Sequence, residues 1–136
     1  MKQIHTKYPF VCLADTRQGG RAENQDTCSW QDTPAGFLIT VCDGMGGGPS
    51  GKRASSLAAE SIINYINSAD ETKDRYRLLR EAVEYANTVV HQEACTDPSK
   101  RGMGTTVTAL LINEESDVVA HVGDSRVYQF RKGRKH

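Results

Sequence analysis

Hydrophobic and polar residues alternate with two different periods along the chain, and the change of period predicts the order of elements. Short apolar runs over residues 10–14 and 36–42 predict buried β-strands, and residues 27–31 predict another strand. Between residues 51 and 96 the apolar positions follow the spacing of amphipathic helices. These positions are Ala54, Leu57, Ala58, Ile62, Tyr65 and Ile66, then Leu79, Ala82, Val83, Ala86 and Val90.

The remaining residues return to the pattern of strands. Residues 105–112, 117–122 and 126–130 predict three strands, with turns at 113–116 and 123–125. Short turns between consecutive strands favour antiparallel pairing. The order of strands, two helices and strands predicts an α+β fold rather than alternating strand and helix units.

The limits of the two helices are also marked in the sequence. The first helix is expected over about 51–67, and the second ends before Pro98. Ser68 and Glu71 have the spacing of a capping box, which predicts the start of the second helix near Ser68.

Composition narrows the choice of partners. The chain has 136 residues, enough for one domain, and its 17 Lys and Arg balance its 17 Asp and Glu. Nucleic-acid binding rests on an excess of positive charge, so no nucleic-acid partner is expected. No apolar run approaches the roughly 20 residues that span a bilayer, and residues 1–5 lack the apolar core of a signal peptide. A cytoplasmic chain without a membrane partner is the expectation.

A glycine-rich segment between the predicted strand 36–42 and the first helix allows two nucleotide-binding interpretations. Gly46 to Lys52 has the P-loop spacing, but Arg53 replaces the Ser or Thr that would hold magnesium. Gly46, Gly48 and Gly51 have the dinucleotide-binding spacing, but a second helix follows where a parallel strand is needed. Nucleotide binding is therefore the weaker alternative.

Acidic residues beside glycines offer a different site. Asp43 ends a predicted buried strand, and Gly44 lets its own carbonyl approach a ligand without a Cβ in the way. Asp124 has a matching place after a later strand, and Asp26 lies five residues beyond Arg21. Carboxylate and carbonyl oxygens suit magnesium or manganese, and arginine suits phosphate. Asp-Gly and Gly-Asp are also ordinary turn dipeptides, so these residues alone leave both interpretations open.

Four segments together resemble a known family. RAENQD (21–26), VCDGMGG (41–47), GMGTT (102–106) and VGDSR (122–126) are similar, in the same order, to motifs of the type 2C metal-dependent serine/threonine protein phosphatases in their bacterial form. The resemblance extends over about residues 10–131. It implies a four-layer α-β-β-α sandwich of two antiparallel sheets flanked by antiparallel helix pairs.

The resemblance also implies an activity. Members hydrolyse phosphoserine and phosphothreonine in phosphoproteins, opposing a serine/threonine kinase in signalling, with a water bridging two Mg²⁺ or Mn²⁺ ions as nucleophile. Asp43 would bridge both ions and the Gly44 carbonyl would ligate one. Gln25 or Asp26 would hold metal-bound water, and Arg21 would clamp the phosphate. An additional ion in bacterial members would take Asp124 as a ligand.

Three departures from the family pattern change these expectations. Met45 stands where some eukaryotic members have a histidine proposed as general acid, so leaving-group protonation would fall to water. Gln25 replaces a common Glu. The family has two further metal-binding aspartates downstream, whereas this chain ends at His136. Residues 1–136 are therefore expected to be the N-terminal portion of one phosphatase catalytic domain. The alternative is a non-catalytic half-domain with a binding or regulatory role.

Overall fold

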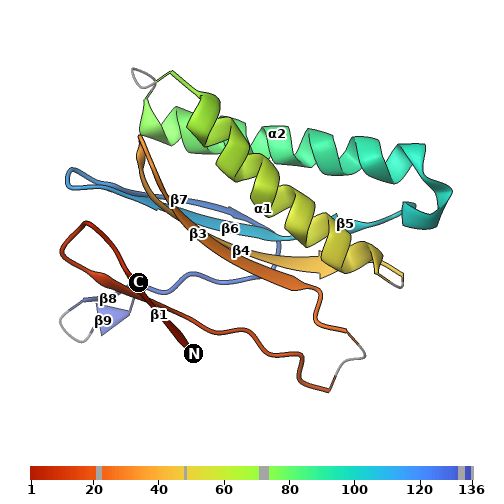
Figure 1. The fold of residues 1–136 in the computed structure, drawn as a ribbon, viewed down its shortest axis with the longest axis horizontal. Coiled ribbons are helices and arrows are strands. Elements are labelled where there is room, and N and C mark those ends of the chain that lie inside the picture. Colours follow the sequence, from red (N-terminus) through yellow and green to blue (C-terminus); the bar gives the residue numbers. More distant parts are fainter. Residues whose placement is uncertain (21–22, 48, 71–73, 132–133, 136) are drawn as a thin grey trace.

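The computed structural model describes residues 1–20, 23–47, 49–70, 74–131 and 134–135. Two long helices form an antiparallel pair that covers one face of a sheet (Figure 1). The first helix lies over the first two strands of that sheet, and the second lies over the last two. The helical elements are α1 (Ser50–Ser68), α2 (Arg75–Thr96) and the short 3₁₀ helix η1 (Pro98–Lys100).

The central sheet is antiparallel, with the strand order β3-β4-β6-β7, and β5 pairs with the end of β4. Its strands are β3 (Asp26–Thr33), β4 (Gly36–Met45), β5 (Gly104–Thr105), β6 (Val107–Ile112) and β7 (Asp117–Val122). Neighbouring strands of the sheet run in opposite directions. One edge of the sheet therefore holds the starts of β3 and β6 and the ends of β4 and β7. The acidic segments singled out in the sequence therefore meet at this edge.

The core lies between the helices and the sheet. Along β4, Leu38, Thr40 and Cys42 are buried toward the helices, while Val41 faces the opposite side and is exposed. This alternation is that of a strand with one covered face. The largest apolar side chains with essentially no exposure are Leu38, Ile62, Ile66, Leu79 and Leu111. Each stabilises the fold by about 1.5–3 kcal/mol through burial of its side chain.

The opposite face of the sheet is partly covered by short hairpins (Figure 1). The Phe10 ring packs edge-on against Phe37 of β4, with ring centroids 5.7 Å apart. The prediction of a buried strand at 10–14 is wrong as to burial, because Val11 is 56% and Leu13 60% exposed. Only one side of the hairpin is packed, and its first strand was not predicted. The hairpin strands are β1 (Lys2–His5), β2 (Val11–Ala14), β8 (Phe130–Arg131) and β9 (Arg134–Lys135).

Two local predictions are wrong. A strand was expected over 126–130, but in the described part of the chain pairing begins only at Phe130. The expected capping box also fails, because Ser68 is the last residue of α1 and Glu71 lies outside the described residues. The cap of α2 is Asp74, whose carboxylate accepts a hydrogen bond from the Tyr76 backbone N–H at 3.3 Å. A true cap accepts from the first turn of its own helix, as Asp74 does.

The α+β class is confirmed by the helix pair and the antiparallel sheets. Of the predicted four layers, the described residues contain one helix pair, the central sheet and the hairpins on its far side. None of the helices formed by the described residues has the length and apolar character needed to cross a membrane.

Candidate metal centre at the end of strand β4

Two aspartates lie side by side at the edge where β4 ends. Asp26, the first residue of β3, is directly opposite Asp43 in the antiparallel register. Opposed residues point to the same face of a sheet, with Cβ atoms about 4.5–5.5 Å apart. That face is the one turned away from α1 and α2, since Cys42 and Gly44 on either side of Asp43 are buried toward the helices. The register thus brings two carboxylates to one point, as the sequence-based hypothesis requires.

A small polar cavity opens at this point. It has a volume of about 150 Å³ and is lined by the predicted residues Gln25, Asp26, Asp43 and Gly44, with Glu23 among its other walls. Residues that carry carboxylate, amide and carbonyl oxygens therefore line one space. Such hard oxygen donors are the ligands that Mg²⁺ and Mn²⁺ prefer.

Glycines allow helix α1 to approach the end of β4 closely. The Gly44 backbone N–H donates to the Gln25 carbonyl at 3.1 Å. A Cβ on Gly44 would overlap the Gly51 carbonyl oxygen, and a Cβ on Gly51 would lie 2.5 Å from the Gln25 Cδ. Gly44 and Gly51 are therefore required by packing as well as by any ligand that the Gly44 carbonyl would bind.

The first turns of α1 also hold the start of β3. The Lys52 Nζ donates to the Asp26 carbonyl at 2.6 Å, and the Ser55 hydroxyl donates to the Gln25 carbonyl at 2.7 Å. These bonds fix the backbone of the two residues that precede and begin β3. In a P-loop the lysine would reach phosphates, whereas this lysine is used inside the fold, which disfavours the nucleotide-binding interpretation.

Asp124 lies farther along the same edge. It is exposed, follows the end of β7, and is not part of the cavity around Asp43. Strand β6 lies between β4 and β7, so β4 and β7 are two inter-strand spacings apart, which is about 10 Å. Among the described residues, no group of three or more His, Cys, Asp or Glu lies close enough to hold one metal ion. The structure therefore brings Asp26 and Asp43 together but leaves Asp124 apart, and Arg21 lies outside the described residues.

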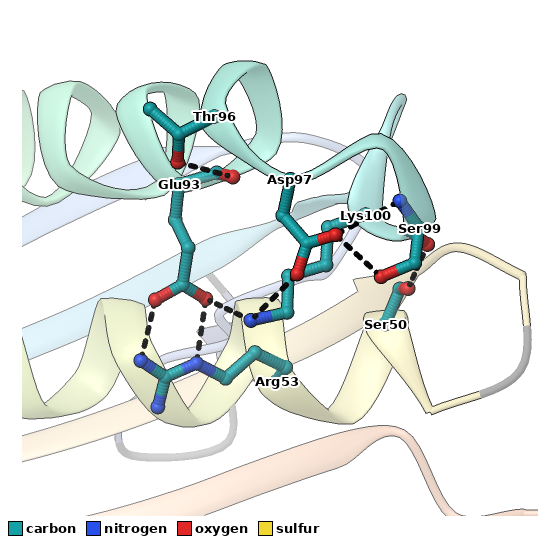
Figure 2. Close-up of polar contacts among 7 residues, drawn as sticks. All are labelled: Ser50, Arg53, Glu93, Thr96, Asp97, Ser99 and Lys100. Carbon is teal, nitrogen blue, oxygen red and sulfur yellow. Dashed lines mark hydrogen bonds and ion pairs between the residues drawn. The ribbon is translucent and has the colours of Figure 1, made fainter.

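An ionic network beside the glycine-rich segment joins α1 to the end of α2 (Figure 2). The Arg53 guanidinium donates to both carboxylate oxygens of Glu93, each at 2.6 Å, and the Lys100 Nζ lies 3.3 Å from the same carboxylate. The hydrogen bond from Arg53, reinforced by Lys100, lowers the pKa of Glu93 from 4.5 to about 2 against the opposing effect of burial. The Ser50 hydroxyl adds a bond of 3.3 Å to the Ser99 carbonyl. Sequence reasoning missed the link between the two helices because Arg53 and Glu93 are 40 residues apart.

The thiol next to Asp43 has no nucleophilic character at neutral pH. Cys42 is completely buried toward the helices. Burial, together with the neighbouring Cys28 thiol, raises the pKa of Cys42 to about 12. A thiolate is the nucleophilic form, so Cys42 does not supply one near pH 7.

Comparison with known proteins decides the family. The sequence model of the family described as Protein phosphatase 2C matches residues 16–136, which is most of the chain. The chain belongs to the protein phosphatase 2C family. The predicted resemblance is thereby confirmed.

Relatives within the protein phosphatase 2C family come from several bacteria. The serine/threonine protein phosphatase PstP of Mycobacterium tuberculosis is 32% identical over 113 residues, which cover 83% of this chain and 21% of PstP. Protein phosphatase PhpP of Streptococcus pneumoniae is 33% identical over 119 residues, covering 85% of this chain and 48% of PhpP. This chain thus spans about half the length of PhpP and about a fifth of that of PstP.

Solved structures of protein phosphatase 2C relatives share the fold. The catalytic domain of PstP in complex with 2 manganese ions superimposes with a TM-score of 0.72 at 33% identity, over 85% of this chain and 48% of that one. The serine/threonine phosphatase Stp1 from Staphylococcus aureus gives a TM-score of 0.77 at 28% identity, over 91% of this chain and 50% of that one. The predicted fold class is confirmed by these structures.

Proposed function

We propose that the protein hydrolyses phosphoserine and phosphothreonine in other proteins, and that residues 1–136 supply the first part of its metal site. The observation that carries this proposal is the register that sets Asp26 opposite Asp43 in one polar cavity with the Gly44 backbone. Membership of the protein phosphatase 2C family, and the names of PstP and PhpP, support the choice of reaction.

The residues of the cavity fit Mg²⁺ or Mn²⁺. Asp26 and Asp43 supply carboxylate oxygens, Gly44 a backbone carbonyl and Gln25 an amide oxygen. Sulfur ligands, which select softer metals, are turned away because Cys42 points into the core. Two such ions, when bound, supply a water of lowered pKa and neutralise part of the phosphate charge. The manganese in the PstP structure is consistent with this choice.

The proposed roles follow from position. Asp43, at the rigid end of a central strand, would hold the two ions together with the Gly44 carbonyl. Gln25 and Asp26, whose carbonyls accept hydrogen bonds from Ser55 and Lys52, would orient water at this site. Arg21 clamps the phosphate because its planar guanidinium donates two parallel hydrogen bonds. Asp124, about two strand spacings away, belongs to an additional cation site rather than to the first.

Partners follow from the reaction. The substrate is a phosphoprotein, and a serine/threonine kinase must supply it, which gives the protein a role in signalling. The balanced charge of the chain motivates the further proposal of a cytoplasmic protein without a nucleic-acid or membrane partner.

The proposal is tested by Mn²⁺-dependent phosphate release from a phosphothreonine peptide by the full-length protein. Asp43→Asn removes the bridging charge, and turnover is expected to fall by at least about a thousandfold, the scale of several kcal/mol of lost transition-state stabilisation. Asp32→Asn is the matched control, because Asp32 is an exposed residue on the same face of β3 at the far end of the strand. Near-wild-type turnover in Asp43→Asn would refute the proposal. Absence of turnover in the wild type at any Mn²⁺ concentration would favour the non-catalytic binding module.

A further inference from the structure

Thr106 lies opposite Asp43 at a break between two strands. Gly44 pairs with Thr105, and Val41 pairs with Thr108, so the same register sets Thr106 opposite Asp43. In a regular antiparallel ladder, such a pair exchanges two backbone hydrogen bonds or none. Here the Thr106 backbone N–H donates to the Asp43 carbonyl at 2.9 Å, which is the first of the two bonds.

The second bond is replaced by a side chain. The Asp43 backbone N–H donates to the Thr106 hydroxyl oxygen at 3.0 Å, where a regular ladder would use the Thr106 carbonyl. That carbonyl accepts instead from the Thr105 hydroxyl at 2.8 Å. Both threonines of the segment 102–106 are therefore used to interrupt the ladder beside Asp43. The replacement of a backbone hydrogen bond by these side-chain bonds explains why β5 and β6 are separate strands.

The Thr106 hydroxyl also reaches the loop that carries Asp124. It lies 3.0 Å from the Ser125 hydroxyl. The Thr106 oxygen accepts from the Asp43 N–H, and either hydroxyl can be the donor in the bond between Thr106 and Ser125. Thr106 is only 4% exposed, so both bonds are shielded from water.

The methyl group of Thr106 contacts the same loop. Gly123 has a φ of +106°, a conformation that favours glycine. A Cβ on Gly123 would lie 2.6 Å from the Thr106 Cγ2, so the methyl group occupies that space. The two branches of one side chain thus hold both the end of β4 and the loop after β7.

We propose that Thr106 is a positioning residue of the metal centre, which fixes the backbone of Asp43 and ties it through Ser125 to the loop that carries Asp124. The inference rests on the proposed function, since it assigns to Thr106 the support of a cation site at Asp43. Outer-shell partners of metal ligands typically change metal affinity by about 10- to 100-fold when they are removed. The affinity of the Asp43 site for Mn²⁺ is therefore expected to depend on the Thr106 hydroxyl.

The test is Mn²⁺ binding to the full-length protein by titration calorimetry. Thr106→Val keeps the methyl group and the shape but removes the hydroxyl, and Kd is expected to rise roughly tenfold or more. Thr106→Ser keeps the hydroxyl, and its Kd is expected to stay close to that of the wild type. Thr108→Val is the matched control, because the buried Thr108 hydroxyl has no hydrogen-bond partner among the described residues. Its Kd is expected not to change.

Three results separate the outcomes. A wild-type Kd in Thr106→Val, or the same rise of Kd in Thr106→Ser as in Thr106→Val, would overturn the role of the hydroxyl.

If Thr106→Val does not fold, as judged by its circular dichroism, Ser125→Ala replaces it. That variant removes only the bond between Thr106 and Ser125, and Kd is expected to rise by about two- to tenfold, the worth of one hydrogen bond; an unchanged Kd would overturn the link between the two loops. Asp43→Asn, measured alongside, tests the site itself: unchanged Mn²⁺ binding there would refute the proposed function, whereas a loss there with normal binding in Thr106→Val would refute only the inference.

Discussion

Asp43 lies directly opposite Asp26 across the antiparallel pair of β3 and β4, on the face turned away from the helices. Like charges directly opposite each other destabilise a strand pair, and a bound cation reverses that effect. The position of the two carboxylates therefore links the stability of this edge to metal binding.

Mn²⁺ is expected to raise the free energy of unfolding of the wild-type protein. At a free concentration of about 100 times Kd, the gain from binding to the folded state alone is about 2.7 kcal/mol. The gain is expected to disappear in Asp43→Asn and to shrink in Asp26→Asn, which retains Asp43. Thermal unfolding with increasing Mn²⁺ measures these gains, and equal stabilisation of Asp43→Asn would contradict the assignment.

Gly44→Ala is expected to destabilise the fold by about 1–3 kcal/mol, the usual cost of overpacking, because the new Cβ would overlap the Gly51 carbonyl. Gly47→Ala provides the control, since a Cβ there meets nothing within 4 Å. Urea unfolding of the two variants measures the difference. A similar small effect in both would show that the contact between α1 and β4 tolerates a side chain.

Glu93→Gln is expected to lower the free energy of unfolding at pH 7 by about 1–2 kcal/mol, a modest value because Arg53 is 44% exposed. The folded state holds the pKa of Glu93 near 2, below its ordinary value of 4.5. The carboxylate therefore contributes its full stabilisation above about pH 4.5 and loses it as the pH falls toward 2.

The difference in the free energy of unfolding between the wild type and Glu93→Gln should accordingly become smaller as the pH falls from 4.5 to 2. Urea titrations at several pH values measure this difference. Glu84→Gln is the control on the same helix, because the ion pair that Glu84 forms among the described residues is an exposed one with Arg80 at 4.0 Å. A difference that did not change with pH would mean that the charge of Glu93 is not what stabilises the helix pair.

Arg75→Lys is expected to cost about 1.5–3 kcal/mol of stability without changing Mn²⁺ affinity. The Arg75 guanidinium donates to the carbonyls of Ala35, Leu111 and Ser116 at 2.8–2.9 Å, which joins the start of α2 to two hairpin turns. A lysine ammonium lacks the planar fork that reaches all three, and each bond to a charged donor is worth about 1.5–3 kcal/mol. Urea unfolding measures the stability of the variant, and Mn²⁺ titration measures its Kd. A change of Kd would contradict the independence of the two ends of the sheet.

Local patterns predicted the elements whose burial repeats along the chain. The helical spacing of Ala54, Ile62 and Ile66 predicted α1 to within one residue at each end, and the apolar run before Asp43 predicted β4. The exposure of Leu13 was not predictable, because the apolar spacing of a strand does not reveal that one of its faces lacks a covering layer.

The proposed metal site has the same limit. Asp43 and Gly44 could be singled out in the sequence because a strand end followed by glycine is a local signal, and their metal-binding roles stay a prediction. The proposed role of Thr106 could not be inferred from the sequence, because residues 105–112 have the pattern of one continuous strand and the interruption depends on hydrogen bonds to Asp43, 63 positions away. The separation of Asp124 from Asp43 depends on the strand order, in which β6 lies between their strands.

The most direct measurement of the central claim is anomalous X-ray scattering from crystals of the full-length protein grown with Mn²⁺. We expect an anomalous peak within roughly 2.6 Å of the Asp43 carboxylate and of the Gly44 carbonyl oxygen, the upper range for oxygen ligands of divalent cations. A second peak is expected on the opposite side of the same carboxylate. Manganese bound only elsewhere, with none at Asp43, would contradict the assignment of the metal centre to the end of β4.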